Sequence, residues 1–445
     1  MEKTICAIST PIGVGGISII RMSGEKSLEI LQKILNDKDF TPIPRRMHLK
    51  SLCGENFSDE VMVVYFPCPN SYTGEDMVEI HCHGGIYITN AILTQLISLG
   101  ATLAENGEFS KRAFINGKMT LDRLEGVIDM INAESEEQGK SAYKLLKGEL
   151  SKKVFGFQDT LTDILAEIEV SLDYPEMDIE IDTLDNFLQK VENLKNEIST
   201  IKNTSETGMI IKNGINIAIL GAPNVGKSSL MNALLGYERA IVTNLEGTTR
   251  DTICESYIYN GIKVNLIDTA GIRESDNEVE KIGIELSLEK INTSDLILFV
   301  VDSSRKLTEE EKNLYDKIKD KKHILVVNKI DKKQEENFDK FSPKIEISTT
   351  ENTNIQNLKQ LIFDTIIGNK IANNSTIITN TRHKIALENA EKSLQDAINT
   401  LKNTKNLELF SIDLQNAYSS LGEITGTSSK ENIIDRIFAK FCLGK

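Results

Sequence analysis

Hydrophobic positions change their spacing along the chain, and each change predicts a different kind of structure. Short β-branched runs such as VMVVYFP and MVEIH come first, separated by glycine-rich turns and by one apolar helical stretch near Ala91 to Leu99. Further on, apolar residues recur at the three-and-four spacing of amphipathic helices. The first pattern predicts a small N-terminal α+β domain over residues 1–118, and the second predicts a helical domain whose first part covers residues 119–212.

The pattern then alternates between strand and helix over residues 213–376. The candidate strands are the short apolar runs INIAIL, KVNLID, DLILFVVD, HILVVN and KIEIS, with helical or loop material between them. Such alternation predicts a doubly wound α/β domain with a mostly parallel sheet. Helical spacing returns over residues 377–445, so we expect a multidomain α/β plus α protein in which the α/β domain is inserted in the helical domain.

Composition narrows the class of protein. A chain of 445 residues is too long for one ordinary hydrophobic core. Its 40% hydrophobic and 26% charged residues are typical of soluble proteins, and no apolar run approaches the roughly 20 residues of a membrane span. The N-terminal residues show no targeting segment, so we expect a cytoplasmic protein without a membrane partner.

Cysteines and charge exclude some further classes of site. The six cysteines contain no CxxC pair, which predicts reduced thiols and not a disulfide framework or a zinc knuckle. A net charge of −15 argues against binding nucleic acid through a global basic field and leaves room for a local basic patch.

We interpret the acidic run DYPEMDIEID as a solvated loop between helices. In HCHGG, strand alternation sends Cys82 away from His81 and His83, which gives a shared metal site poor geometry.

The segment GAPNVGKSS carries the strongest chemical signal. It follows a predicted strand and precedes a predicted helix, which is the context that a GxxxxGK[ST] phosphate loop requires. Backbone N–H groups of such a loop wrap the phosphates, Lys227 can reach the β- and γ-phosphates, and the Ser228 hydroxyl can bind Mg²⁺. The α/β domain is therefore predicted to be a Ras-like P-loop domain.

Three further motifs follow in the order expected of a GTPase: GTTRD, DTAG and NKID. Asp331 of NKID can accept both guanine N1–H and N2–H, which adenine does not offer. Thr249 is the candidate switch hydroxyl for Mg²⁺, Asp268 its outer-sphere anchor, and Gly271 the backbone N–H that senses the γ-phosphate. The segment ISTT is expected to be the last base-binding loop. The predicted GTP-binding residues are Asn224, Val225, Gly226, Lys227, Ser228, Ser229, Thr243, Asn244, Leu245, Glu246, Gly247, Thr248, Thr249, Asp268, Thr269, Ala270, Gly271, Asn328, Lys329, Ile330, Asp331, Ser348, Thr349 and Thr350.

The residue that orients the attacking water is not the usual one. Ras-type enzymes have glutamine directly after DTAG, whereas this chain has Ile272, which can neither donate nor accept a hydrogen bond. Glu274 is our catalytic candidate, and the alternative is an exposed carboxylate of the switch loop. Arg250 and Arg273 could supply positive charge to the transition state or could belong to the surface.

These motifs resemble those of a known group of proteins. GAPNVGKSSL, GTTRD and DTAGIRE look like the TrmE–Era–EngA group of GTPases. Together with PNSYTGEDMVEIHCHGG, GEFSKRAFINGK and the terminal FCLGK they resemble the MnmE (TrmE) family over the whole chain. The resemblance implies a homodimeric, K⁺-dependent GTPase that works with an FAD-containing partner, MnmG. The two would install an aminomethyl or carboxymethylaminomethyl group at C5 of the wobble uridine of tRNA.

The resemblance also assigns further ligands and residues. It implies 5-formyl- or methylene-tetrahydrofolate as the one-carbon cofactor, beside Mg²⁺, K⁺ and the substrate GTP. The implied folate-binding residues are Arg21, Glu79, Lys118 and Lys445, and the implied K⁺ ligands are Asn224, Thr243, Leu245 and Thr248. From the residues alone, Glu79 could pair with the donor edge of a pterin and Arg21 with a glutamyl tail, and surface salt bridges are the alternative.

The terminal thiol of Cys442 leaves two interpretations open. CLGK is not a prenylation signal, because Gly444 is not aliphatic, and a lone cysteine is not a zinc site. Periodicity places Cys442 on one face with Ile437 and Phe441, which favours a buried packing residue. The nearby Lys445 could lower the thiol pKa, and the resemblance implies a part in the modification chemistry, so we expect a catalytic role. The rival functions are a ribosome-assembly or RNA-binding switch GTPase of the Era/EngA type and a structural scaffold for the partner.

Overall fold

The computed structural model describes residues 3–444 apart from residues 55, 174–180, 237–253, 269–293, 336, 340, 369–376, 429–430, 440 and 442–443. The chain divides into two compact units. The first comprises residues 1–128, 144–192 and 389–445, and the second comprises residues 129–143 and 193–388. Among the described helices, none combines the length and the apolar character that a membrane crossing requires.

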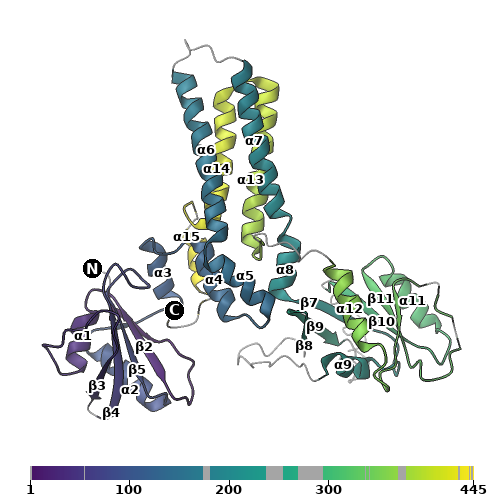
Figure 1. The fold of residues 1–445 in the computed structure, drawn as a ribbon, viewed down its shortest axis with the longest axis horizontal. Helices are drawn as coiled ribbons and strands as arrows, with labels where there is room; N and C mark the ends of the chain where they lie inside the picture. Colours follow the sequence, from purple (N-terminus) through teal and green to yellow (C-terminus); the bar gives the residue numbers. More distant parts are fainter. Residues whose placement is uncertain are drawn as a thin grey trace, which may run out of the picture. The chain divides into compact units, whose positions relative to one another are not determined.

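The N-terminal part of the first unit is a six-stranded sheet with the order β3-β4-β5-β2-β1-β6. Its neighbouring strands are antiparallel, except that β1 and β6 are parallel. The strands are β1 (Ile5–Ile8), β2 (Ser18–Ser23), β3 (His48–Cys53), β4 (Ser58–Phe66), β5 (Met77–Cys82) and β6 (Thr102–Leu103), and the helices are α1 (Ser27–Ile34), α2 (Ile86–Ser98) and α3 (Glu108–Ile115). Figure 1 shows α1 and α2 beside this sheet.

Strand alternation gives this sheet two different faces. Ile20 and Ile80 share one buried core with apolar residues of α1 and α2. Arg21 and Glu79, their neighbours in sequence, therefore lie on the other face. The antiparallel register places Arg21 directly opposite Glu79 on β2 and β5. A cation and a carboxylate thus meet on the face that α1 and α2 do not cover.

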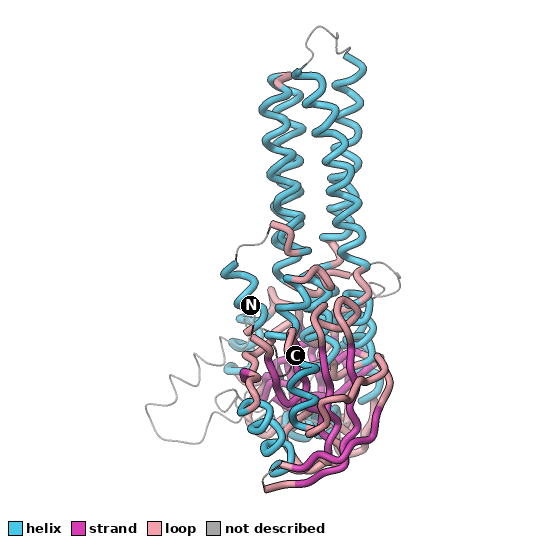
Figure 2. Tube along the Cα trace, turned by 90° about the vertical axis from the view of Figure 1, so that its left-hand side faces the viewer, coloured by secondary structure: helices cyan, strands magenta, loops and turns pink. Residues whose placement is uncertain are grey.

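The helices that follow are α4 (Leu121–Ile131), α5 (Glu136–Leu146), α6 (Glu149–Asp173), α7 (Ile181–Lys202), α8 (Ser205–Asn213), α13 (Thr381–Thr404), α14 (Leu407–Thr425) and α15 (Glu431–Phe438). Figure 2 shows the long ones as extended cyan coils. Within the first unit, the rings of Phe187 and Phe410 lie 6.3 Å apart. Lys402 Nζ lies 2.8 Å from Glu192 Oε1. Apolar spacing on one helical face and polar pairs on another account for this bundle.

The second unit contains the predicted α/β domain, a six-stranded sheet with the order β12-β11-β10-β7-β9-β8. All neighbouring strands are parallel except β8 and β9. The strands are β7 (Ile215–Leu220), β8 (Cys254–Tyr259), β9 (Ile262–Asp268), β10 (Leu296–Asp302), β11 (His323–Asn328) and β12 (Lys344–Glu346), and the helices are α9 (Lys227–Leu235), α11 (Glu309–Ile318) and α12 (Ile355–Ile366).

Alternate residues of the central strand β10 enter two different cores. Leu298 and Val300 pack in the core that includes residues of α9 and α12, whereas Phe299 and Val301 pack in the core that includes Ile318 of α11. Helices therefore cover both faces, as in a doubly wound domain.

The predicted fold class is confirmed: an N-terminal α+β part, a helical part and an inserted α/β domain. Helix α2 begins at Ile86, earlier than the stretch near Ala91 that the sequence predicts. The predicted domain boundaries stay predictions. The acidic run begins on α6, which ends at Asp173, and its last residues lie on α7, which begins at Ile181. The central residues of that run lie outside the described part of the chain.

Candidate functional site

The loop between β7 and α9 has the form of a phosphate cradle. Asn224 and Gly226 have positive φ angles of 64° and 98°, and Gly226 caps the N-terminus of α9. A Cβ on Gly221 would lie 2.3 Å from Val300 O, and a Cβ on Gly226 would lie 2.3 Å from Asn328 Nδ2, so both positions require glycine. The first N–H groups of α9 have no acceptor within the helix and present positive partial charge toward the loop.

Lys227, the first residue of α9, reaches back over this loop. Its Nζ donates to Gly221 O at 3.0 Å and to Ala222 O at 2.7 Å. Ser228 and Ser229 follow Lys227 in the first turn of α9. An ammonium group held over the loop, together with N–H groups of a helix N-terminus, fits the phosphates of a nucleotide. Ser228 would hold Mg²⁺ in such a complex.

Loops that are distant in the sequence meet this cradle at the carboxyl edge of the sheet. Asn328 Nδ2 donates to Val225 O at 2.9 Å, and Lys329 Nζ donates to Asn224 O at 2.7 Å. Thr349 N donates to Asn328 Oδ1 at 3.2 Å. These hydrogen bonds join the phosphate loop, the NKID segment and the ISTT segment into one site.

Asp331 carries the carboxylate that is predicted to select guanine. Ser348 Oγ donates to Asp331 Oδ1 at 2.6 Å, and Glu351 N donates to Ser348 Oγ at 3.1 Å. Ile330 and Thr350 lie in the same two loops. Because the loop orients this carboxylate, its oxygens can accept the paired N–H donors of guanine, which adenine lacks.

Asp302, the last residue of β10, and Ser303, which follows it, support the site, although neither was predicted from the sequence. Asp302 Oδ2 accepts from Lys329 Nζ at 2.6 Å, and Ser303 Oγ donates to Lys329 O at 2.8 Å. Burial raises the pKa of Asp302, but hydrogen bonds from Lys329 and Ser304 outweigh burial and lower this pKa to about 2. The ionised carboxylate therefore fixes Lys329 beside the phosphate loop. The available signal was the position of Asp302 at the carboxyl end of a buried parallel strand.

Part of the predicted nucleotide site lies outside the described residues. Residues 237–253 are not described; they contain the candidate K⁺ ligands Thr243, Leu245 and Thr248, the candidate Mg²⁺ ligand Thr249, and Asn244, Glu246 and Gly247. The same is true of Thr269, Ala270, Gly271 and the catalytic candidate Glu274. Asp268 ends β9, and its side chain is not described. The roles of these residues stay predictions.

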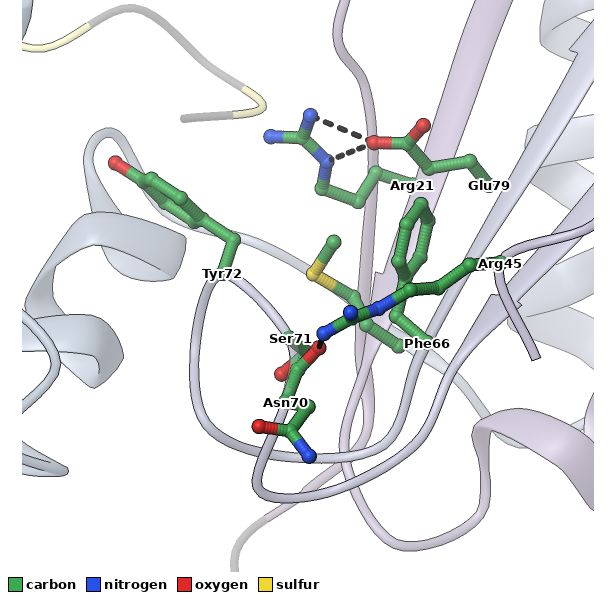
Figure 3. A pocket seen from close by; sticks show the side chains of 8 residues that line it. Arg21, Arg45, Phe66, Asn70, Ser71, Tyr72 and Glu79 are labelled. Carbon is green, nitrogen blue, oxygen red and sulfur yellow. Dashed lines mark hydrogen bonds and ion pairs between the residues drawn. The ribbon is translucent and has the colours of Figure 1, made fainter.

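A second candidate site is a pocket of about 440 Å³ in the first unit. Arg21 Nε and Nη2 donate to Glu79 Oε1 at 3.0 and 2.8 Å, and Figure 3 shows this pair at one end of the pocket. The guanidinium carbon of Arg21 lies 5.8 Å from the ring centres of both Tyr72 and Phe109, a cation–π geometry. The pocket is lined by Arg21, Arg45, Phe66, Asn70, Ser71, Tyr72, Met77 and Glu79.

Two of the predicted folate-binding residues therefore line one pocket, and a third lies beside it. Lys118 Nζ donates at 2.8 Å to the carbonyl of Pro69, which precedes the pocket residue Asn70. A donor edge of a pterin fits Glu79, whose Oε2 takes no part in the bond to Arg21. Arg45 and Tyr72 were not predicted from the sequence, because neither belongs to a motif whose spacing assigns it to a site.

A buried polar network holds the loop that forms one wall of this pocket. Arg112 Nη1 lies 3.2 and 3.1 Å from the two carboxylate oxygens of Glu75. Arg112 Nη2 donates to Glu108 Oε1 at 2.8 Å, and Ser23 Oγ donates to Glu75 Oε2 at 2.7 Å. Glu75 belongs to the same loop as Tyr72, so this network holds the loop that carries a pocket residue.

The C-terminal segment lies against Arg21 of this pocket. Gly444 O accepts from Arg21 Nη1 at 3.3 Å and from Ser9 Oγ at 3.1 Å. Gly444 has a φ angle of 87°, and a Cβ there would lie 2.3 Å from Ile8 O, so this close approach requires glycine. Cys442 and Lys445 lie outside the described residues, and their roles stay predictions.

The histidines near the pocket do not form a shared metal site. Cys82 is buried in the core under α1 and α2, whereas His81 Nε2 lies 3.4 Å from Glu79 Oε2 on the opposite face. His83 Nδ1 instead pairs with Asp59 Oδ1. Within the described part of the chain, no group of three His, Cys, Asp or Glu residues is placed to hold a metal ion.

Comparisons with known proteins cover the whole chain. The family model for the GTP-binding protein TrmE N-terminus matches residues 4–118, and the model for the MnmE helical domain matches residues 121–442. The tRNA modification GTPase MnmE of Clostridioides difficile is 43% identical over 100% of both chains, and the protein of that name from Alkaliphilus metalliredigens is 41% identical over 100% of both.

Solved structures match parts of the chain. The G domain of the T. maritima FeoB iron transporter is 29% identical and covers 34% of this chain and 98% of its own, with a TM-score of 0.27. An Aquifex aeolicus Era variant is 25% identical and covers 40% of this chain and 66% of its own, with a TM-score of 0.28. The family models and the full-length relatives, taken with the two sites, lead to one conclusion: the chain belongs to the MnmE family of tRNA modification GTPases.

Proposed function

We propose that this chain is a K⁺-dependent GTPase that modifies the wobble uridine of tRNA together with an FAD-containing MnmG-type partner. The two proteins would install an aminomethyl or carboxymethylaminomethyl group at C5 of the uridine with a one-carbon unit from a tetrahydrofolate. The coarse activity, GTP hydrolysis within tRNA modification, follows from membership of the family. The finer elements are a homodimer acting in the cytoplasm, dependence on K⁺, the folate and the partner.

One observation carries the folate part of this proposal. Arg21 Nη1 donates to Gly444 O, so the C-terminal segment lies at the pocket that holds Arg21 and Glu79. Cys442 precedes Gly444 by two positions in the sequence. Glu79 would accept hydrogen bonds from the donor edge of the pterin ring of a folate. Lys118 and Lys445 would contact the acidic glutamyl tail of the same folate. The proposed thiol chemistry of Cys442 would then take place beside the one-carbon donor.

The nucleotide site would control this chemistry and not perform it. Lys227 and the first N–H groups of α9 bind the phosphates, and Asp331 selects guanine. Asn224 would hold K⁺ with residues 243–248; the bound ion supplies positive charge near the β–γ bridge, the part that an arginine finger has in other GTPases. Glu274 would orient the attacking water. Hydrolysis would time a conformational step and form no bond to the uridine.

Reconstitution with labelled cofactor tests the proposal. The chain is mixed with the MnmG-type partner, tRNA, GTP and methylene-tetrahydrofolate whose one-carbon unit is ¹³C, with glycine or ammonium as the amine donor. We expect ¹³C at C5 of the wobble uridine in K⁺ buffer, and a GTP hydrolysis rate at least about tenfold lower when Na⁺ replaces K⁺, because a cation in place of an arginine finger stabilises the transition state. Asn224→Ala should abolish the difference between the two cations.

The matched control is Asn232→Ala, which removes an exposed amide from α9 and should leave the K⁺ stimulation unchanged. Unlabelled uridine with normal GTP hydrolysis would contradict the folate assignment. Equal hydrolysis rates in K⁺ and Na⁺ would contradict the K⁺ assignment.

A further inference from the structure

The pocket in the first unit contains two arginines with different surroundings. Arg21 forms an ion pair with Glu79 at 2.8 Å, so a carboxylate of the protein already balances its charge. Arg45 also lines the pocket, and no carboxylate among the described residues forms an ion pair with it. An anionic group of a ligand is therefore attracted more strongly to Arg45 than to Arg21.

Arg45 is held in place for such a contact. Its Nη2 donates to Asn70 O at 2.8 Å, and its backbone N–H donates to Tyr65 O at 2.8 Å. Its φ angle of 59° lies in the left-handed region, which is uncommon for a residue other than glycine and is found often at functional sites. A guanidinium group has five N–H donors, and the others remain available for a planar carboxylate.

A second cation lies near the same loop. Lys118 Nζ donates to Pro69 O, next to the carbonyl that Arg45 contacts, and it forms no ion pair with a described carboxylate. In Figure 3 the ring of Phe66 lies between the Arg21–Glu79 pair and Arg45. The pocket thus has a charge-balanced end, where Glu79 Oε2 lies 3.4 Å from His81 Nε2 and takes no part in the bond to Arg21, an apolar middle and a positive end.

We propose that Arg45, with Lys118 near it, recognises the glutamyl carboxylates of a folate in this pocket, and that Arg45 makes the pocket prefer charged over neutral tails. The inference rests on the proposed function, because that function supplies a folate as the ligand. The three parts of a folate match the three parts of the pocket in the same order. Its pterin carries hydrogen-bond donors, its benzoyl group is apolar and its tail carries two carboxylates. Arg45 is a specificity residue in this proposal and has no part in bond formation.

Ligand pairs that differ only in charge test the proposal. Affinities of 5-formyl-tetrahydrofolate and of its α,γ-diamide, which is neutral and nearly isosteric, are measured by titration calorimetry with the full chain and with Arg45→Gln. We expect Arg45→Gln to weaken binding of the acid by roughly tenfold or more, since hydrogen bonds to charged groups are the strong ones, and to change binding of the diamide by less than about twofold. The salt dependence of acid binding should also become weaker.

Two further variants separate charge from folding. Arg46→Gln removes the same charge from the neighbouring exposed residue, which does not line the pocket, and should leave both affinities unchanged. Arg45→Lys keeps the charge and should retain part of the preference for the acid. If Arg45→Gln weakens acid and diamide equally, or neither, the inference is wrong while the folate site stands. If the wild-type chain binds neither ligand, the folate part of the proposed function is wrong and the inference with it.

Discussion

Replacing Asp331 with asparagine is expected to change the preferred nucleotide from GTP to xanthosine triphosphate. The carboxylate of Asp331 is proposed to accept two N–H groups of guanine, whereas an amide in its place would present an N–H₂ donor to the second carbonyl of xanthine. Affinity for GTP should fall at least about a hundredfold, because a site built to pair polar groups strongly rejects a ligand that leaves them unpaired. Ser348 Oγ, 2.6 Å from Asp331 Oδ1, can still donate to an amide oxygen, so the loop should keep its form.

Competition with a fluorescent guanine nucleotide measures this change for GTP and xanthosine triphosphate with the full chain. The control is Asp316→Asn on α11, whose exposed side chain pairs with Lys319 and should not alter the base preference. Undiminished GTP binding by Asp331→Asn would show that this carboxylate does not read the base. A loss of both nucleotides would point to misfolding of the loop and is checked by the melting temperature.

Replacing Arg112, the cation of the buried network in the first unit, is expected to lower the free energy of unfolding more than the other substitutions proposed for this chain. Arg112→Met leaves Glu75 and Glu108 without their shared guanidinium partner. The side chain of Arg112 is only 8% exposed, and breaking a buried ion pair from one side costs about 3–5 kcal/mol in the free energy of unfolding. Because the chain has several domains, hydrogen exchange of β2 and β5 in increasing urea is the suitable measurement.

Two comparisons make this result specific. Lys111→Met removes the neighbouring surface ion pair with Asp435 and should cost less than about 1 kcal/mol. Arg112→Met combined with Glu75→Met should recover part of the loss, because no carboxylate of that pair is then left without a partner. Equal effects of Arg112→Met and Lys111→Met would contradict the structural role of the network.

The helices and strands could be predicted from the sequence because local patterns of hydrophobic residues determine them. The phosphate loop, NKID and ISTT were assigned to one site, and the hydrogen bonds from Lys329 to Asn224, from Asn328 to Val225 and from Thr349 to Asn328 agree with that grouping. Such motifs are informative because the carboxyl ends of parallel strands always meet at one edge. The role of Asp302 was missed because its contact with Lys329 depends on the pairing of β10 with β11.

The pocket was harder to predict because it, too, depends on how strands pair over long distances in the sequence. Nothing local in the sequence places Arg21 opposite Glu79; the register of β2 and β5 does so. Arg45 lies in a loop and has no motif, and its contact with Asn70 forms only when the sheet has folded. The docking of Gly444 on Arg21 joins residues from the two ends of the chain, and only the family resemblance had linked those regions.

Mass spectrometry of tRNA nucleosides tests the central claim most directly. Cells that lack this protein are complemented with the wild type, with Cys442→Ser, or with Cys53→Ser, a control at an exposed cysteine of the N-terminal sheet. We expect the C5-aminomethyl-type uridines to disappear without the protein, to return with the wild type and with Cys53→Ser, and to stay absent with Cys442→Ser. Full restoration of the modified uridines by Cys442→Ser would show that this thiol has only a packing role. Unchanged uridine levels in cells without the protein would contradict the tRNA function and favour a ribosome-assembly GTPase instead.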